Sequence, residues 1–328
     1  MDNIEKKQPI LIVYHCYLTK KWKELITQQL DRLINSKLYD EADNIYVTIN
    51  LGDVEIEDVI SFFKRYEKLN LEFFKDNHGE YPGILKVKQL SKEFDAKILY
   101  FHTKGVSNNW TTFNGGEISD IKSKNSNYWR EFMEYFLIDN WRECVSKLDY
   151  YDNVGASLNG KEFWGNFWWT KTSHINKTCD VGIWSRWDYE SWINKDCPES
   201  LSYQFYHLGF NPYLTELTPK LYNGEYDKFK GCRIIIKSAT YGTPPFEIDE
   251  GYSTTPLNVV NDVTEIVTKL LDTHNGFKLS FNVNNETMGG DPKWGSRKCL
   301  IIKFSPEGFN DEIIEMGVCE GHNIEFKF

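Results

Sequence analysis

The chain has no run of basic residues and carries an excess of acidic ones. Among its 328 residues, 48 are Asp or Glu and 38 are Lys or Arg, which gives a formal net charge of −10. Binding to duplex nucleic acid depends on clustered Lys and Arg side chains that displace counterions from the phosphates. The composition therefore argues against a nucleic acid duplex as partner, and an anionic ligand would need a local basic site.

Long apolar segments and paired cysteine motifs are absent as well. No stretch approaches the roughly 18 apolar residues of a membrane span, and the polar N-terminus lacks the pattern of a signal peptide. The seven cysteines include no C-x-x-C pair, the spacing typical of zinc and redox sites. These absences predict a protein without a transmembrane segment and with reduced thiols, located in the cytoplasm or, for a viral protein, in the host cytoplasm.

The first half of the chain alternates strand-like apolar segments with helical patterns. The predicted strands are 10–14, 44–50, 71–74 and 97–101, and the predicted helices are 22–34, 56–69 and 84–94. Strands joined by helical crossovers form mostly parallel sheets, so the fold class is α/β. The polar segment 106–126 is predicted to be a loop over the functional site, followed by a helix at 127–148.

The segment 97–107, KILYFHTKGVS, joins an apolar strand directly to polar and basic residues. Ligands of open α/β sheets bind beyond the carboxyl ends of the strands. Lys104 offers three donors and Gly105 permits close backbone approach, which suits an anionic group such as a phosphate. Taken alone, the segment is also explained by a strand that ends in an ordinary polar turn.

Four further motifs follow this segment in a fixed order. They are WREFMEYF at 129–136, YDNVGA at 151–156, GNFWW at 165–169 and RWDYESWI at 186–193. Together with HTKG, and with Glu80 and Gly83 before it, they resemble a family of bacterial and viral glycosyltransferase-like proteins with a GT-A, nucleotide-sugar-binding fold. The resemblance spans about residues 8–215. It implies transfer of a sugar from a nucleotide-sugar donor to a hydroxyl of a glycan or other acceptor.

The resemblance assigns the donor to the ends of the first and fourth strands. The expected donor-binding residues are Tyr14, His15, His102, Thr103, Lys104, Gly105 and Arg186. Lys104 is the first candidate to neutralise phosphate. His102 is expected to bind a metal, to bond the diphosphate or to cap its strand, and Tyr14 to stack on the base or to pack in the core. Many GT-A enzymes carry Asp-x-Asp where this chain has His102-Thr103-Lys104, so a requirement for Mn or Mg is left open.

Sugar transfer with inversion needs a carboxylate that takes the proton of the acceptor hydroxyl. On a helix, Arg186 and Glu190 share one face because they are four residues apart, whereas Asp188 points elsewhere. Given the resemblance, Glu190 is the first candidate for the catalytic base and Asp188 the second. Without it, a surface ion pair worth at most about 0.5 kcal/mol explains these charges.

The acceptor or the donor sugar is expected to meet the GNFWW segment. The expected residues are Gly165, Asn166, Trp168 and Trp169. Aromatic faces pack on the apolar faces of sugars, and an Asn amide bonds hydroxyls as both donor and acceptor. Adjacent strand residues face opposite sides, so at least one of the two Trp side chains is expected to be simply buried.

From Arg233 onward the pattern changes to short β segments separated by Gly and Pro turns. The segments ATYG at 239–242, DVT at 262–264, GDP at 290–292 and KCL at 298–300 resemble a small β domain at the C-terminus of certain J-domain proteins. We therefore predict a GT-A-like domain at 1–228 and an all-β, sandwich-like accessory domain at 229–328.

Two other functions remain open at this point. One is a non-catalytic sugar- or nucleotide-binding protein, because the familiar Asp-x-Asp is missing. The other is an assembly module whose β domain binds a protein or carbohydrate partner. A purely stabilising β domain fits the sequence equally well.

Overall fold

The computed structural model describes residues 8–19, 21–76, 78–103, 116–183, 186–243, 259–296 and 298–328. The chain divides into two compact units, Met1–Asn109 with Met133–His207, and Trp110–Phe132 with Leu208–Phe328. The boundary predicted after residue 228 falls within the second unit. Independent folding of either part stays a prediction.

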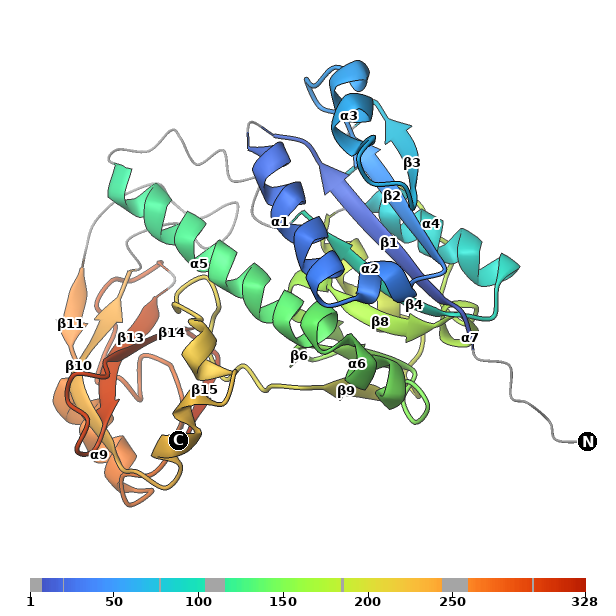
Figure 1. Ribbon diagram of the computed structural model, residues 1–328. Helices are drawn as coiled ribbons and strands as arrows, with labels where there is room; N and C mark the ends of the chain where they lie inside the picture. Colours follow the sequence, from blue (N-terminus) through green and yellow to red (C-terminus); the bar gives the residue numbers. More distant parts are fainter. Residues whose placement is uncertain are drawn as a thin grey trace, which may run out of the picture. The chain divides into compact units, whose positions relative to one another are not determined.

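The first unit is built on a seven-stranded sheet with the order β3-β2-β1-β4-β8-β5-β9 (Figure 1). Its strands are β1 (Ile10–Tyr17), β2 (Asn44–Asn50), β3 (Leu69–Phe74), β4 (Lys97–His102), β5 (Asn153–Gly155), β8 (Trp168–Lys171) and β9 (Ser202–Gln204). Strands β3, β2, β1 and β4 run parallel, as do β5 and β9. Strand β8 is antiparallel to β4 and β5. The prediction of a mostly parallel α/β sheet is therefore confirmed. A separate two-stranded ribbon is formed by β6 (Leu158–Asn159) and β7 (Glu162–Phe163).

The helices of the amino-terminal half include those predicted at 22–34, 56–69 and 84–94, although the second ends already at Phe63. They are α1 (Trp22–Asn35), α2 (Leu38–Glu41), α3 (Ile56–Phe63), α4 (Tyr81–Glu93), α5 (Gly116–Glu134), α6 (Trp141–Lys147), α7 (Thr172–Ile175) and α8 (Arg186–Ser191). The loop predicted at 106–126 is wrong for 116–126, which belongs to α5, and 104–115 lies outside the described residues. A π-helical turn at Tyr135–Asp139 breaks the helix predicted at 127–148. None of the helices in the described ranges has both the length and the apolar character of a bilayer crossing.

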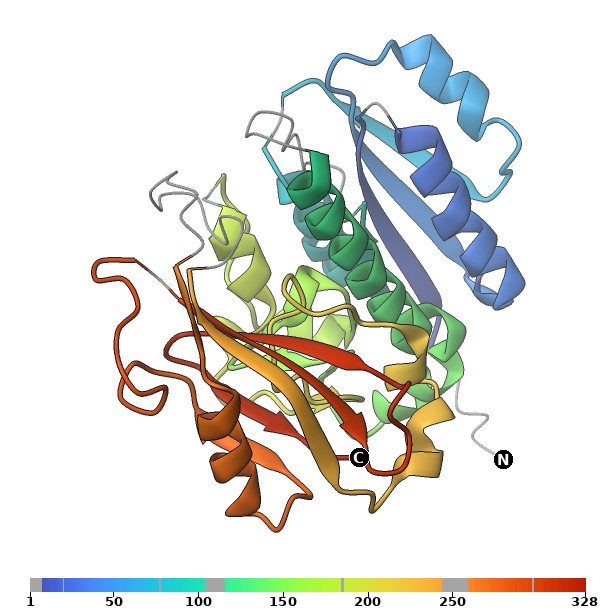
Figure 2. The same cartoon turned by 90° about the vertical axis from the view of Figure 1, so that its left-hand side faces the viewer.

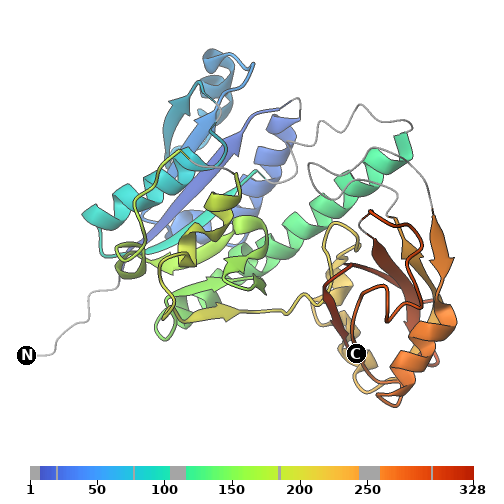
Figure 3. The same cartoon turned by 180° about the vertical axis from the view of Figure 1, so that it is seen from behind.

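Both faces of the sheet in the first unit are covered. Leu11 and Val13 of β1 pack in one core cluster with Ile84 and Val87 of α4, and α4 lies on the face seen in Figure 3. The next residue, Tyr14, points to the other face, toward α1, which is in front in Figure 1. Alternate residues of a strand face opposite sides, so a strand covered on both faces must be apolar throughout. This explains the unbroken apolar runs of β1 and β4.

The connectivity of this sheet changes direction between β1 and β4. From β1 the chain moves outward to β2 and β3, and it then returns through α4 to β4 on the opposite side of β1. In open α/β sheets such a reversal leaves a crevice at the carboxyl ends of the two strands that flank it. Here those ends are Tyr17 of β1 and His102 of β4.

The second unit has an antiparallel sheet with the order β11-β10-β13-β14 (Figure 2). Its strands are β10 (Ile234–Gly242), β11 (Val260–Asp262), β13 (Cys299–Pro306) and β14 (Ile314–Cys319), with a separate pair β12 (Leu279–Asn282) and β15 (Asn323–Phe326). The all-β prediction is wrong at α9 (Thr264–Asp272), which buries Val267 and Leu271. These two are four residues apart and so share one helical face.

Candidate functional site

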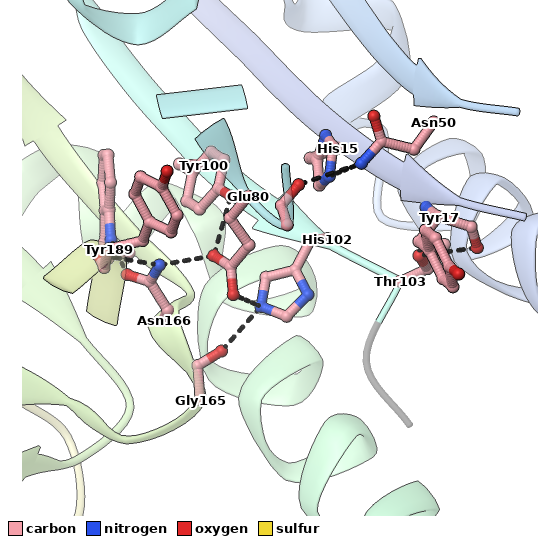
Figure 4. A network of polar contacts seen from close by, with 12 residues as sticks. His15, Tyr17, Asn50, Glu80, Tyr100, His102, Thr103, Gly165, Asn166 and Tyr189 are labelled. Carbon is pink, nitrogen blue, oxygen red and sulfur yellow. Dashed lines mark hydrogen bonds and ion pairs between the residues drawn. The ribbon is translucent and has the colours of Figure 1, made fainter. Parts of the chain in front are cut away.

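Three neighbouring strands place a row of polar side chains near their carboxyl ends. The register sets His15 of β1 beside Thr48 of β2 on one side and beside His102 of β4 on the other. His15 Nδ1 lies 2.9 Å from Thr48 Oγ1, and the backbone N–H of Thr103 donates to the His15 carbonyl at 3.0 Å. Figure 4 shows these residues at the sheet edge that the topology singles out.

His15 is a neutral imidazole in this setting. Burial lowers its pKa to about 4; the Glu80 carboxylate opposes this shift and His102 adds to it. Asn50 Nδ2 donates to the Gly79 carbonyl at 3.0 Å and lies 3.5 Å from His15 Nε2. Thr48 and the Asn50 amide thus contact the two ring nitrogens of His15, one on each side of the ring. His15 therefore offers no positive charge to a phosphate at neutral pH.

The buried His15 predicts a loss of stability in mild acid. The unfolded chain takes up a proton near pH 6.5, whereas the folded chain does so only near pH 4. Protons thus bind preferentially to the unfolded state between these values, and the free energy of unfolding should fall by about 3 kcal/mol as the pH drops through this window. Urea unfolding at several pH values measures the loss. A His15→Gln variant should lose this part of the pH dependence, and an unchanged slope in that variant would assign it to other groups.

The Glu80 carboxylate joins several side chains of the row. Its Oε2 accepts hydrogen bonds from the Tyr100 hydroxyl at 2.9 Å and from Asn166 Nδ2 at 2.6 Å. Its Oε1 lies 3.5 Å from His102 Nε2, which also donates to the Gly165 carbonyl at 3.0 Å. The Glu80 and His102 side chains are only 13% and 10% exposed. Bonds between such groups gain strength because little water competes for them.

Gly83 allows the first turn of α4 to bring Glu80 to this place. A Cβ atom on Gly83 would lie 2.8 Å from both His15 Cβ and Tyr100 Cε2. Those two atoms are held by a strand and by a buried ring, so neither can move away easily. The helix begins one residue after Glu80, with a proline in its first turn. The close packing of this turn on β1 and β4 therefore fixes the position of the carboxylate.

We expect Gly83→Ala to lower the free energy of unfolding by about 1 to 3 kcal/mol, because the added methyl group overpacks the helix–sheet contact. In a helix with open space the same change stabilises by about 1 kcal/mol. Urea denaturation measures the sign directly. A stabilised variant would show that α4 can move away from the sheet without cost.

The turn before β8 holds Asn166 in the same network. Gly165 and Asn166 have φ angles of +79° and +56°, a left-handed conformation that Gly and Asn adopt most readily. Asn166 Oδ1 accepts a hydrogen bond from Trp168 Nε1 at 2.7 Å, which orients Nδ2 toward Glu80 and toward the Tyr189 carbonyl at 3.3 Å. Asn166 thereby connects Glu80 to helix α8, one residue before Glu190.

The two candidate catalytic carboxylates of α8 have different surroundings. Burial raises the pKa of Tyr100 well above its usual value, and the charges of Glu80 and Glu190 add to this shift. Burial also raises the pKa of Glu162, again with a contribution from Glu190. Asp188 instead lies 3.2 Å from Lys195 Nζ and is 39% exposed. The structure therefore brings Glu190 near the polar network and places Asp188 in a surface ion pair.

Three of the predicted contact residues lie in the core. The Tyr14 ring is fully buried and stacks on Phe101 at 4.4 Å, and its hydroxyl donates to Gln29 at 2.7 Å. Trp168 and Trp169 are both fully buried, on opposite faces of β8. Trp168 packs on Tyr100, and Trp169 Nε1 donates to the Leu137 carbonyl. Core packing, the alternative stated for Tyr14, is therefore confirmed, as is the burial of at least one of the two Trp side chains. No exposed ring face is left on Tyr14 for a base, or on Trp168 and Trp169 for a sugar.

Of the remaining predicted donor-binding residues, the structure describes only some. Thr103 is buried and bridges two strands, since its Oγ1 accepts from the Tyr17 backbone N–H at 2.8 Å. Lys104, Gly105 and the Arg186 side chain lie outside the described residues, so their roles stay predictions. In the described ranges, no three His, Cys, Asp or Glu residues gather as a metal site.

Sequence reasoning assigned no role to several residues that the structure brings to this site. Glu80 was part of the family resemblance, but only its position between α4 and the strand ends shows its contacts. Asn50 ends β2, and its position at a strand end was the available signal. Its Oδ1 atom is buried and has no hydrogen-bond partner among the residues that the structure describes, so a ligand or a water molecule would complete its bonding.

The site thus combines the buried imidazoles of His15 and His102 and the Asn50 amide, near the carboxyl ends of β1, β4 and β2, with the half-buried Glu80 carboxylate and the Asn166 amide. A second carboxylate, Glu190, comes from α8. Among models of known protein families none matches the chain, and a search of curated proteins finds no significant relative. The membership of the glycosyltransferase-like family that the motifs indicate accordingly stays a prediction.

Proposed function

We propose that the first unit is a GT-A-like glycosyltransferase that moves a sugar from a nucleotide-sugar donor to a hydroxyl of a glycan or other acceptor. The observation that supports this most is the polar network of His15, Glu80, His102 and Asn166, at the edge where the strand order reverses. Ligands with a nucleotide part commonly bind at such an edge. The contact of Asn166 with α8 links the same edge to a candidate base.

In the proposed reaction, Glu190 takes the proton of the acceptor hydroxyl while the oxygen attacks the anomeric carbon of the donor. The bond between this carbon and the diphosphate oxygen breaks, and the nucleoside diphosphate leaves with the bonding electrons. Lys104 and Arg186 are the cations proposed to neutralise its negative charge. Neutral His15 is not suited to that task.

The neutral members of the network have a different proposed task. The Glu80 carboxylate holds Asn166 and the Tyr100 hydroxyl in place, and burial keeps Tyr100 protonated as a donor. Groups fixed in this way bind a substrate without the entropy loss that orienting mobile side chains would cost. In this proposal they position the segment around Gly165 against the donor.

A direct assay tests the proposal. The purified chain is incubated with a panel of nucleotide sugars, with and without Mn or Mg, and the release of nucleoside diphosphate is followed. The same panel is examined by thermal shift, because a ligand present at about 100 times its dissociation constant stabilises the fold by about 2.7 kcal/mol. Release of the nucleotide with one donor supports the proposal. A panel without binding and without release would contradict it.

A second candidate function is a sugar- or nucleotide-binding protein without turnover. Glu80 contacts both Asn166 and His102, and His102 also donates to the Gly165 backbone. Such a network can hold the shape of a binding site without taking part in a reaction, which favours this function. Binding of a nucleotide sugar without release of the nucleotide, in the presence of varied acceptors, would support this function over transfer.

A further inference from the structure

Two cysteines of the second unit face each other across adjacent strands. Cys299 begins β13 and Cys319 ends β14, and the register pairs them directly. Their sulfur atoms lie 3.5 Å apart, and both residues are buried. In the sequence they are 20 positions apart and form no C-x-x-C pair, so only the strand register reveals the pair.

The ladder geometry around this pair is compatible with a covalent link. The backbone N–H of Glu320 donates to the Lys298 carbonyl at 2.8 Å, so 298 and 320 form a hydrogen-bonded pair. Pairs alternate in an antiparallel ladder, and Cys299 and Cys319 therefore form a non-hydrogen-bonded pair, with Cα atoms about 4.5 Å apart. That separation lies within the range of about 4.4 to 6.8 Å spanned by disulfides. The two sulfurs can thus join after small side-chain rotations.

Apolar residues surround the two cysteines, and a hydrogen-bond donor lies beside one of them. Leu214 and Ile301 pack against the two sulfurs, and Asn211 Nδ2 donates to Cys319 Sγ at 3.2 Å. An N–H donor favours negative charge on sulfur, and the thiolate is the form that attacks a disulfide. The outer side of β14 is covered by segment 211–215: the Asn211 N–H donates to the Gly317 carbonyl at 2.8 Å, and the Gly317 N–H donates to Thr215 Oγ1 at 3.0 Å. This short segment is not a strand of the sheet, and its local opening would give a reagent access to the pair.

We propose that Cys299 and Cys319 are a reversible redox modification site. The two cysteines form a disulfide with each other across the strands when a low-molecular-weight disulfide such as oxidised glutathione oxidises them. The Cys319 thiolate attacks one glutathione sulfur, which breaks that disulfide and releases one glutathione. The Cys299 sulfur, on losing its proton, then attacks Cys319 Sγ and releases the second glutathione. The two cysteines are oxidised, one external disulfide is reduced to two thiols, and the protein loses two hydrogen atoms.

The experiment uses the full chain in glutathione buffers that range from fully reduced to fully oxidised. Remaining thiols are blocked with an alkylating agent, and the digested protein is analysed by mass spectrometry. We expect a linked pair of peptides containing Cys299 and Cys319, about 2 Da lighter than the sum of the two thiol peptides. Its amount should rise with the oxidised fraction and vanish after reduction.

Two variants act as controls. Cys232→Ser changes a half-buried cysteine of the same unit and should leave the link unchanged, whereas Cys319→Ser should abolish it. If Cys319→Ser does not fold, the peptide analysis of the chain without substitutions is sufficient to test the proposal. Alkylation of both cysteines in the most oxidised buffer, or a link between other cysteines in their place, would overturn the proposal.

Discussion

Replacing Glu190 with glutamine should lower the turnover of sugar transfer about 100-fold or more, while binding of the donor changes little. The amide keeps the size and the hydrogen-bonding reach of the side chain but cannot take a proton from the acceptor. Steady-state kinetics and donor titration on the same preparation separate the two effects, because loss of a base lowers kcat without weakening ground-state binding.

Asp188→Asn is the matched control, since it makes the same chemical change two positions away on α8. The Asp188 carboxylate pairs with Lys195 at the surface, and such pairs contribute only about 0 to 1 kcal/mol. We expect nearly normal turnover. The opposite result, an active Glu190 variant and an inactive Asp188 variant, would make Asp188 the base.

Replacing Glu80 with leucine should lower the free energy of unfolding by about 3 to 5 kcal/mol. The change leaves the Tyr100 hydroxyl and Asn166 Nδ2 without their acceptor, and each buried donor left unpaired costs about 1 to 3 kcal/mol. Leucine has a similar volume, so the loss would come from the broken polar network rather than from a cavity. Urea unfolding of the full chain gives the value.

Glu93→Leu provides the comparison, because Glu93 lies at the other end of α4 and is exposed. Surface changes of this kind stay within about 0.5 kcal/mol. Equal stabilities of the two variants would show that Glu80 does not form its hydrogen bonds with Tyr100 and Asn166 in solution. Donor binding by the Glu80 variant, measured below its unfolding transition, then tells whether the network also shapes the site.

Local patterns predicted most of the secondary structure. Strand β2 has the predicted bounds, and α1 buries the predicted residues Trp22, Leu25 and Leu30. The segment 116–126 was expected to be a loop because its residues are mostly polar, yet it belongs to a helix that buries Asn125 and Ser126, and the Asn125 side chain donates to the Tyr213 carbonyl. Helix α9 has only nine residues, and it lies between β segments. Its helical spacing of apolar residues was therefore not recognised in the sequence.

The alternation of strands and helices can be read from the residue pattern alone, and so can the polar residues that end the apolar strands. Both signals are local, because side-chain direction repeats every 2 residues in a strand and every 3.6 in a helix. The burial of both Trp168 and Trp169, and the contact of Glu80 with Asn166, 86 positions away, become visible only in the folded chain. Such contacts depend on the packing of whole elements, here on the close approach of Gly83 to β1 and β4, which no local pattern encodes.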